Sequence, residues 1–362
     1  MVSESRGEMK GMTSRERWLA AINHKVPDRL PMAYSATPEF TEKLMRHLGC
    51  GDEQELMDRL GVDKQWGVWP DYVGPPLAKG ETVFGARFDE IDYGLGVYTD
   101  IDGKCTYNPL AKYKTVAEIE ANYTWPSPDW WDYSDIRAQV EGKEDWVITG
   151  GASEPFMDYK EQLRGPEQSF VDLIENPEIV HYCLGKMYDL CYEQTRRIYE
   201  QIPGKVMITY VAEDMGTQQS LLYSPGQIRE FFLPHMKRMI DLAHQAGAYV
   251  MHHSDGAVRA ILPDMVAAGI DMLDPIQWRC KGMEREGLKR DFGDKIVFHG
   301  AMDNQYTLAF GSEGEVRQEV RDNIEKLGRE SYILAPCHMI QPVSSVENIV
   351  AMYDEARQYG EY

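Results

Sequence analysis

The amino-acid sequence predicts an α/β protein whose parallel strands close into a (β/α)8 (TIM) barrel. Eight short apolar runs recur along the 362 residues with little polar alternation, which is typical of strands buried on both faces of a parallel sheet. Helix-like segments separate the runs, with Ser, Thr or Pro near their starts and Gly after their ends. Eight repeats favour a closed barrel over the alternative, an open doubly wound sheet, and no run is followed by a GxGxxG or GxxxxGKS/T motif.

The predicted strands, in chain order, occupy residues 30–35, 62–69, 146–151, 206–211, 248–253, 272–276, 296–300 and 332–336. In a TIM barrel the C-terminal ends of all strands meet at one face, where the active site lies. The residues that directly follow each run are therefore the candidates for chemistry.

Several segments between the runs are predicted to be helical, namely residues 115–123, 169–201, 224–246, 259–268 and 314–327. Residues 81–108 differ, because aromatic and β-branched residues alternate there between Gly and Asp turns, as in an antiparallel ribbon. We expect this ribbon to be inserted after the second strand, where it could cover the barrel mouth or form a homodimer contact. The expected organisation is a polar N-terminal tail at residues 1–12 and one barrel domain at residues 13–362.

Composition and charge exclude several classes of protein. The formal net charge of −21 repels nucleic-acid phosphates and anionic membranes, and no apolar run is long enough to span a bilayer. The N-terminal residues lack the apolar core of a secretion signal, and the six cysteines show no CxxC pairing. We therefore expect a cytoplasmic enzyme with reduced thiols that acts on a small molecule.

The turn His253-Ser254-Asp255-Gly256 follows the fifth predicted strand and is the main candidate for a metal site. Residues two apart on a strand point the same way, so His253 and Asp255 are expected to face one centre, whereas His252 should pack toward the helices. An imidazole and a carboxylate suit Zn²⁺. The alternative is a hydrogen-bonded Asp–His pair without metal.

Further candidates follow the other predicted strands. Glu213 and Asp214 come after the fourth run, and Cys337 and His338 after the eighth. The candidates for substrate binding are Ser35, Asp71, Tyr72, Glu154, Gln277 and His299. Aromatic residues that cluster in the first part of the chain either pack in the core or form a wall for a flat substrate: Trp66, Trp69, Tyr72, Trp125, Trp130 and Trp131.

Taken in order, these residues carry a pattern found in a known family. The stretches are MTSRER (12–17), PDRLP (27–31), LRGPE (163–167), EDMGTQ (213–218), HSDG (253–256), FHGAMD (298–303) and APCH (335–338). On these stretches the chain resembles the uroporphyrinogen decarboxylase superfamily over most of its length. The resemblance implies the barrel fold, and it is closer to the corrinoid-dependent methyltransferase-like branch than to the haem-pathway decarboxylase.

The haem-pathway enzymes carry an arginine-rich motif after the first strand that holds the carboxylates of their substrate. Here Ser35-Ala36-Thr37-Pro38 occupies those positions without an arginine, and the net charge of −21 opposes a polycarboxylate. His338 does match a late histidine of the decarboxylases. The alternative function is therefore a decarboxylase acting on uroporphyrinogen III or on a smaller carboxylic acid.

The methyltransferases of the superfamily bind zinc through His-x-Cys on one strand end and a Cys on the last. Carried over, these positions are His253, Asp255 and His338, with Cys337 next to them. The set lacks the two thiolates and is harder, so it suits polarisation of an ether or hydroxyl oxygen, or else it binds no metal.

The resemblance thus implies a methyltransferase that demethylates a small methoxylated or methylated substrate with the help of Zn²⁺. A corrinoid carried by a separate partner protein would accept the methyl group. Glu213, Asp214, Asp255 and His338 are the expected catalytic residues, which protonate the leaving group. A small-molecule or corrinoid-partner binding protein without catalytic activity is the remaining alternative.

Overall fold

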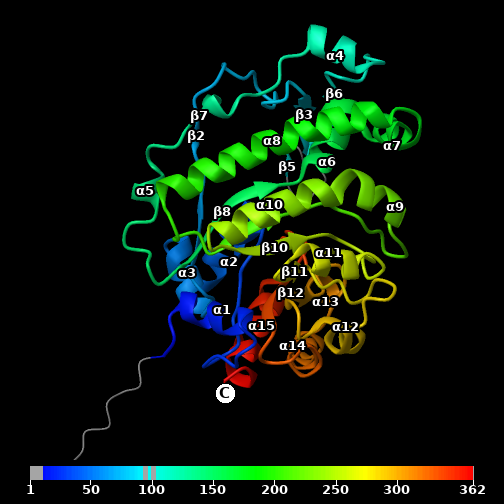
Figure 1. The fold of residues 1–362 in the computed structure, drawn as a ribbon. Helices are drawn as coiled ribbons and strands as arrows, with labels where there is room; N and C mark the ends of the chain where they lie inside the picture. Colours follow the sequence, from blue (N-terminus) through cyan, green and yellow to red (C-terminus); the bar gives the residue numbers. More distant parts are fainter. Residues whose placement is uncertain (1–10, 93–96, 99–102, 362) are drawn as a thin grey trace, which may run out of the picture.

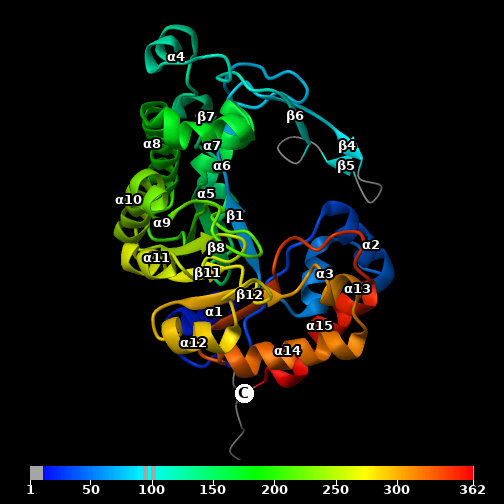
Figure 2. The same ribbon diagram turned by 90° about the vertical axis from the view of Figure 1, so that its right-hand side faces the viewer.

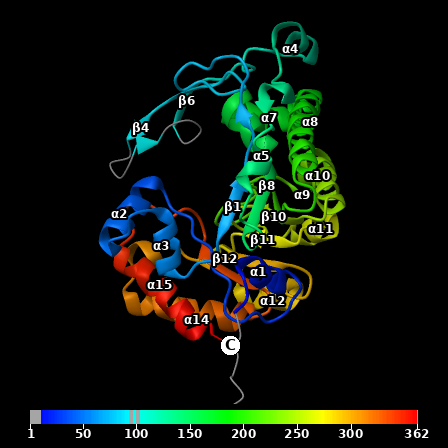
Figure 3. The ribbon, with the colours of Figure 1, turned by 90° about the vertical axis from the view of Figure 1, so that its left-hand side faces the viewer.

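The computed structural model describes residues 11–92, 97–98 and 103–361. Its centre is a parallel sheet in the order β1-β8-β9-β10-β11-β12-β13, which curls into a half-barrel with helices along its outer face (Figures 1 and 3). The strands are β1 (Gln65–Val68), β8 (Val147–Ser153), β9 (Ile208–Val211), β10 (Tyr249–His253), β11 (Met272–Asp274), β12 (Val297–Met302) and β13 (Tyr332–Pro336). The predicted α/β fold with a parallel sheet is confirmed, and each of these strands lies at a predicted run.

Helices connect most of the strands, as parallel pairing requires. The α-helices of the described chain are α1 (Ser14–Ile22), α2 (Pro38–Leu48), α3 (Glu53–Leu60), α4 (Val116–Asn122), α5 (Ile136–Gln139), α6 (Pro155–Asp158), α7 (Pro166–Glu175), α8 (Pro177–Gln201), α9 (Pro225–Gln227), α10 (Leu233–Gln245), α11 (Leu262–Ala268), α12 (Arg285–Phe292), α13 (Thr307–Phe310), α14 (Glu313–Leu327) and α15 (Val346–Tyr359). Every predicted helical segment overlaps at least one of them. The segment 169–201 is divided at Asn176, because Pro177 has no N–H to continue the helical hydrogen bonds.

Residues 30–35, the first predicted strand, do not form a regular strand. Met32 pairs with Leu334 of β13 in an isolated parallel bridge, and its carbonyl accepts a hydrogen bond from the N–H of Asp63, just before β1. Pro31 cannot donate to a ladder, which explains why the pairing stays so short. The segment nevertheless lies between the two end strands of the sheet.

The carboxylate of Asp63, whose side chain is fully buried, joins three parts of the N-terminal region. It accepts hydrogen bonds from Arg17 Nη1 (2.5 Å), Arg29 Nη2 (2.8 Å), Trp18 Nε1 (3.2 Å) and the N–H of Met32 (3.0 Å). Arg17 and Arg29 belong to two of the stretches that carried the family resemblance, 12–17 and 27–31. These two stretches therefore have a structural role in this protein.

The stretch 163–167 also has a structural part. The buried guanidinium of Arg164, at the end of the π-helical turn Tyr159–Arg164, pairs with both carboxylate oxygens of Asp172 in α7. It also donates to the carbonyls of Leu110 and Tyr113 at 2.6 and 2.8 Å. These bonds fasten the chain after the segment 81–108 to α7.

Short antiparallel pairs follow β1 and stand apart from the parallel sheet, and one of them, β4 (Ile91–Asp92) with β5 (Val97–Tyr98), lies on the side of the molecule where α2 lies (Figure 2). They are β2 (Asp71–Tyr72) with β7 (Trp131–Asp132), β3 (Arg87–Asp89) with β6 (Lys104–Tyr107), and β4 (Ile91–Asp92) with β5 (Val97–Tyr98). The last two pairs fall within the predicted ribbon at 81–108, of which residues 93–96 and 99–102 lie outside the described part of the chain.

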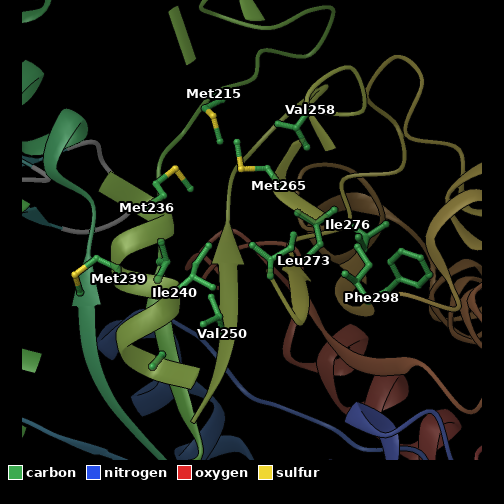
Figure 4. Packing of buried hydrophobic residues seen from close by; sticks show 14 of the residues in the cluster. Met215, Met236, Met239, Ile240, Val250, Val258, Met265, Leu273, Ile276 and Phe298 are labelled. Atoms are coloured by element: carbon green, nitrogen blue, oxygen red, sulfur yellow. The ribbon is translucent and has the colours of Figure 1, made fainter. Parts of the chain in front are cut away.

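Successive side chains along each strand point to opposite faces of the sheet, so the core has an outer and an inner layer. Outward-facing residues pack against the helices, for example Val250 of β10 near Ile240 of α10 (Figure 4). Met251 belongs instead to an inner cluster with Met272, Val297 and Ile333, which the Trp18 side chain of α1 joins from one end. No helix among the described residues is both long and apolar enough to cross a membrane.

Candidate active site

A cavity of about 530 Å³ lies on the inner side of the sheet, at the C-terminal ends of the strands. Its polar lining includes Ser35, Thr149, Ser153, Glu154, His253, Asp274, His299 and His338, and its aromatic lining Tyr34, Trp69 and Tyr210. None of the described residues that line it is a lysine or an arginine. This position is the one expected for the active site of a barrel.

A bulge in β8 shapes one wall of the cavity. The pairing of β8 with β9 changes register between Thr149 and Ala152, and Gly151 has a φ of +75°. A Cβ at Gly151 would lie 2.5 Å from the Thr195 side chain, so the bulge requires glycine. Beyond it, Ser153 and Glu154 line the cavity.

Asp274, at the end of β11, holds three cavity residues with one carboxylate. It accepts hydrogen bonds from His253 Nδ1 (2.7 Å), His299 Nδ1 (2.6 Å) and the Tyr210 hydroxyl (2.6 Å). Burial alone would raise the pKa of Asp274, but the charge of His299 and the bonds from both histidines hold the pKa well below its ordinary value. Asp274 is thus an anion that fixes both rings.

The ring of His253 turns its other nitrogen toward two further carboxylates. Nε2 lies 3.7 Å from Asp214 Oδ1 and 4.0 Å from Asp255 Oδ1, and one ligand atom from each residue fits within 4.8 Å of the others. Burial would lower the pKa of His253, but the hydrogen bond and charge of Asp274, with the charges of Asp255 and Asp214, raise it to about 9. The site therefore attracts a positive charge to Nε2.

These three residues fit a small divalent cation with hard ligands. Zinc bound at 2.0–2.2 Å in a tetrahedron separates its ligand atoms by about 3.3–3.6 Å, close to the observed Nε2 distances. Asp274 holds the non-ligating nitrogen of His253, an arrangement that commonly orients zinc-bound histidines. Gln277 Nε2 donates to Asp255 Oδ1 at 2.9 Å and orients that carboxylate as well.

Two glycines bring the three residues together. A Cβ at Gly216 would lie 2.5 Å from the carbonyl oxygen of Asp255, and a Cβ at Gly256, whose φ is +89°, would lie 2.5 Å from the carbonyl carbon of Gly216. The loops after β9 and β10 thus pack backbone against backbone. The N–H of Asp255 donates to Asp214 Oδ1 at 2.9 Å, which holds Asp214 beside His253.

The predicted metal ligands separate in the structure. His253 and Asp255 lie together, and Asp214, predicted as a catalytic residue, lies with them. Cys337 is buried, its thiol contacts the carbonyl of Ile276 at 3.4 Å, and burial raises its pKa well above the ordinary value, which opposes a thiolate. His338 is exposed at the cavity, and neither it nor Cys337 belongs to the three-residue group found among the described residues.

Glu213 does not lie with the other predicted catalytic residues. Its buried carboxylate accepts hydrogen bonds from the N–H groups of Phe156 (2.6 Å) and Met157 (3.1 Å) at the start of α6. Burial, together with the charge of Glu154, raises the pKa of Glu213 well above its ordinary value. Through these two bonds Glu213 positions the start of α6, behind the cavity wall.

The predicted substrate residues also divide. Ser35, Glu154 and His299 line the cavity, and Gln277 contacts Asp255. Asp71 and Tyr72 lie in β2, paired with β7, and are not among the described lining residues. Sequence reasoning placed Asp274 at the end of the sixth run but gave it no role, and it missed Tyr210. The position of Asp274 in a short apolar run was the available signal, but its three partners come from other strands.

Asp158→Asn is expected to stabilise the protein near neutral pH. Burial and the charge of Glu154 raise the pKa of Asp158 from 3.8 to about 7, so the unfolded chain releases its proton at lower pH than the folded chain does. The stability of the wild type therefore falls as pH rises from about 4 to about 7, by about 1–3 kcal/mol given the partial exposure of the residue. Asparagine keeps an acceptor for Gln162 Nε2.

Urea unfolding at pH 5 and pH 8 measures this effect, with Asp135→Asn, an exposed aspartate, as control. The Asp158→Asn variant should lose part of the pH dependence that the wild type and the control share. Equal pH dependence in all three proteins would show that Asp158 ionises normally.

Comparison with known proteins gives a family and a fold. The family model described as uroporphyrinogen decarboxylase (URO-D) matches residues 140–359, which include the strands β8 to β13. The chloroplastic uroporphyrinogen decarboxylase of Zea mays is 22% identical over 278 residues, which cover 73% of this chain and 66% of that protein. The chloroplastic enzyme of Nicotiana tabacum is 21% identical over 215 residues, which cover 59% of this chain and 49% of that protein. The matches thus span half to two thirds of these relatives.

A solved structure, a methyltransferase from Methanosarcina mazei, superimposes with a TM-score of 0.68 over 96% of this chain and 99% of that chain. The two sequences are 18% identical, so this likeness is one of fold.

Proposed function

The chain belongs to the uroporphyrinogen decarboxylase family, and from this premise we propose that it is a methyltransferase that demethylates a small methoxylated or methylated substrate. The methyl group would pass to the cobalt of a corrinoid carried by a separate protein. The observation that carries the proposal is the group of Asp214, His253 and Asp255 beside a cavity without lysine or arginine among its described lining residues. A decarboxylase for a porphyrinogen with many carboxylates needs cationic groups that this lining does not offer.

We propose that Asp214, His253 and Asp255 hold a divalent cation such as Zn²⁺, in place of the set with His338 and Cys337 expected from the sequence. When bound, such a cation supplies Lewis acidity toward the leaving oxygen of the substrate. Asp274 keeps Nδ1 of His253 occupied, so that Nε2 is the nitrogen that faces the cation site. Gln277 keeps Asp255 oriented toward the same point.

One residue of the cavity is placed to donate a proton to the leaving oxygen, and another lines the wall for the substrate. His338 is exposed at the cavity, and Glu154, whose pKa burial raises above the ordinary value, lines its wall. In the proposed reaction the methyl carbon leaves its oxygen for Co(I), which becomes methyl-Co(III), and the oxygen keeps the electron pair and takes a proton. His338 would donate that proton.

The finer features of the fold belong to the same proposal. Residues 30–35 would complete the ring as its eighth element, within one barrel domain that covers residues 13–362. The antiparallel pairs after β1 would flank the mouth where the corrinoid protein docks.

The test combines metal analysis with methyl transfer. The purified protein is expected to bind one Zn²⁺ and, with cob(I)alamin and a methoxylated aromatic compound, to form methylcobalamin, which is followed by its absorbance. His253→Ala should lose both properties. His244→Gln is the matched control, because His244 is a surface histidine bonded to Asp271 as His253 is bonded to Asp274. Zinc retained by His253→Ala would refute the metal site, and no methylcobalamin from any methylated substrate would refute the reaction.

A further inference from the structure

Negative charge exceeds positive charge around the cavity. Glu154 and Asp274 line it, and Asp214 and Asp255 lie beside His253. Because no described lining residue is a lysine or an arginine, the balancing charges come from histidine or from a bound ion. The four carboxylates outnumber the positive charges that His253 and His299, or His299 and a single divalent cation, would bring.

Among these carboxylates, Glu154 has no cation in direct contact within the described chain, and the charge of His253 acts on it only from beyond ion-pair distance. No described residue forms a salt bridge with it, and its side chain makes no capping bond to α6, which begins directly after it. Asp274, in contrast, is held by two histidines and a tyrosine. The carboxylate of Glu154 is thus free to face a cation inside the cavity.

The neighbouring Ser153 also lacks a partner. Its residue is only 2% exposed, its hydroxyl has no hydrogen-bond partner among the described residues, and it lines the same cavity. A buried hydroxyl without a partner costs about 1–3 kcal/mol, so a bound polar molecule would relieve that cost. Ser153 and Glu154 together mark one wall as a place for a polar, positively charged group.

Aromatic rings complete the lining. Trp69 is 56% exposed, and its Nε1 lies 3.0 Å from where a Cβ at Gly67 would be, so the indole lies back across the strand at this glycine. Trp69, Tyr34 and Tyr210 all line the cavity. Aromatic faces attract ammonium groups, and quaternary ammonium ions are commonly bound by such rings.

We propose that the methylated substrate of this cavity carries an ammonium group, which Glu154 and the aromatic lining recognise. This inference rests on the proposed function, because it takes the cavity to be the substrate site. The net charge of −21 would also steer a cation toward the protein. Ser153 would bind a polar atom near that ammonium group.

The test compares choline with its uncharged isostere, in which a tert-butyl group replaces the trimethylammonium. Isothermal titration of the purified protein is expected to give choline about tenfold higher affinity than the isostere. Glu154→Gln should remove about tenfold of the choline affinity and leave the isostere unaffected. Trp69→Leu should also weaken choline more than the isostere. Glu347→Gln, an exposed glutamate in α15, is the control.

Equal affinity for the two ligands, no binding of choline at millimolar concentration, or an unchanged Glu154→Gln variant would each overturn the inference. The comparison of two ligands on the wild type does not depend on how the variants fold. Binding is measured without corrinoid, so the outcome is separate from the methyl-transfer test. Methylcobalamin formed from neutral methoxylated compounds, without preference for cationic ones, would leave the proposed function standing and refute this inference alone.

Discussion

Zinc binding is expected to weaken by about 10- to 100-fold when Asp274 is replaced by asparagine. Oδ2 of Asp274 accepts from His253 Nδ1 and from the Tyr210 hydroxyl, and Oδ1 accepts from His299 Nδ1. The asparagine side chain has only one acceptor oxygen. Its NH2 group would face one or more of these donors and could not accept their hydrogen bonds. The His253 ring would then lose the charged partner that directs Nε2 toward Asp214 and Asp255.

Competition with a chromophoric chelator measures the zinc affinity of the variant. The matched control is Asp271→Asn, because Asp271 lies just before β11 and accepts from His244 Nε2 at 2.8 Å, so that a similar pair stands at the other end of the same strand. The control should bind zinc as the wild type does. If Asp274→Asn also binds zinc as the wild type does, then Asp274 does not orient His253 for zinc binding and the prediction is wrong.

The strands could be predicted because both of their faces are buried, which leaves apolar runs that no helix face or exposed strand imitates at that length. The run at residues 30–35 passes the same test but forms only the bridge at Met32. Its apolar residues are buried as expected, but Pro31 removes a donor and the carboxylate of Asp63 takes the N–H of Met32. The apolar residues of this run predicted that it would be buried, but they did not predict which backbone hydrogen bonds it would form.

The candidate metal site could be predicted in part for a similar reason. His253 and Asp255 follow one strand, and their two-residue spacing indicates a shared direction. Asp214 lies beside them only because the loops at Gly216 and Gly256 touch, which is a contact between segments about forty residues apart. The two glycines were visible in the sequence, but spacing alone does not reveal that they pack against each other.

Replacing Asp63 by alanine is expected to lower the free energy of unfolding by about 3–5 kcal/mol. The substitution would leave the guanidinium of Arg17 with fewer partners, and it would remove the only acceptor within the described chain that Arg29, Trp18 and Met32 share. The loss exceeds that of an exposed ion pair because the side chain of Asp63 is 0% exposed, so water cannot replace it without opening the core.

Urea unfolding measures this loss, with Asp28→Ala as the matched control. Asp28 also pairs with Arg17, at 2.7 Å, but its side chain is 32% exposed, so we expect a loss of about 1 kcal/mol. Asp63 fixes Met32 between β13 and β1, so its loss should also loosen the cavity wall at Ala33, Tyr34 and Ser35 and weaken ligand binding there. Equal losses for the two variants would mean that the contact between α1 and the ends of the sheet depends on apolar packing around Trp18, and that the buried ion pairs add little to it.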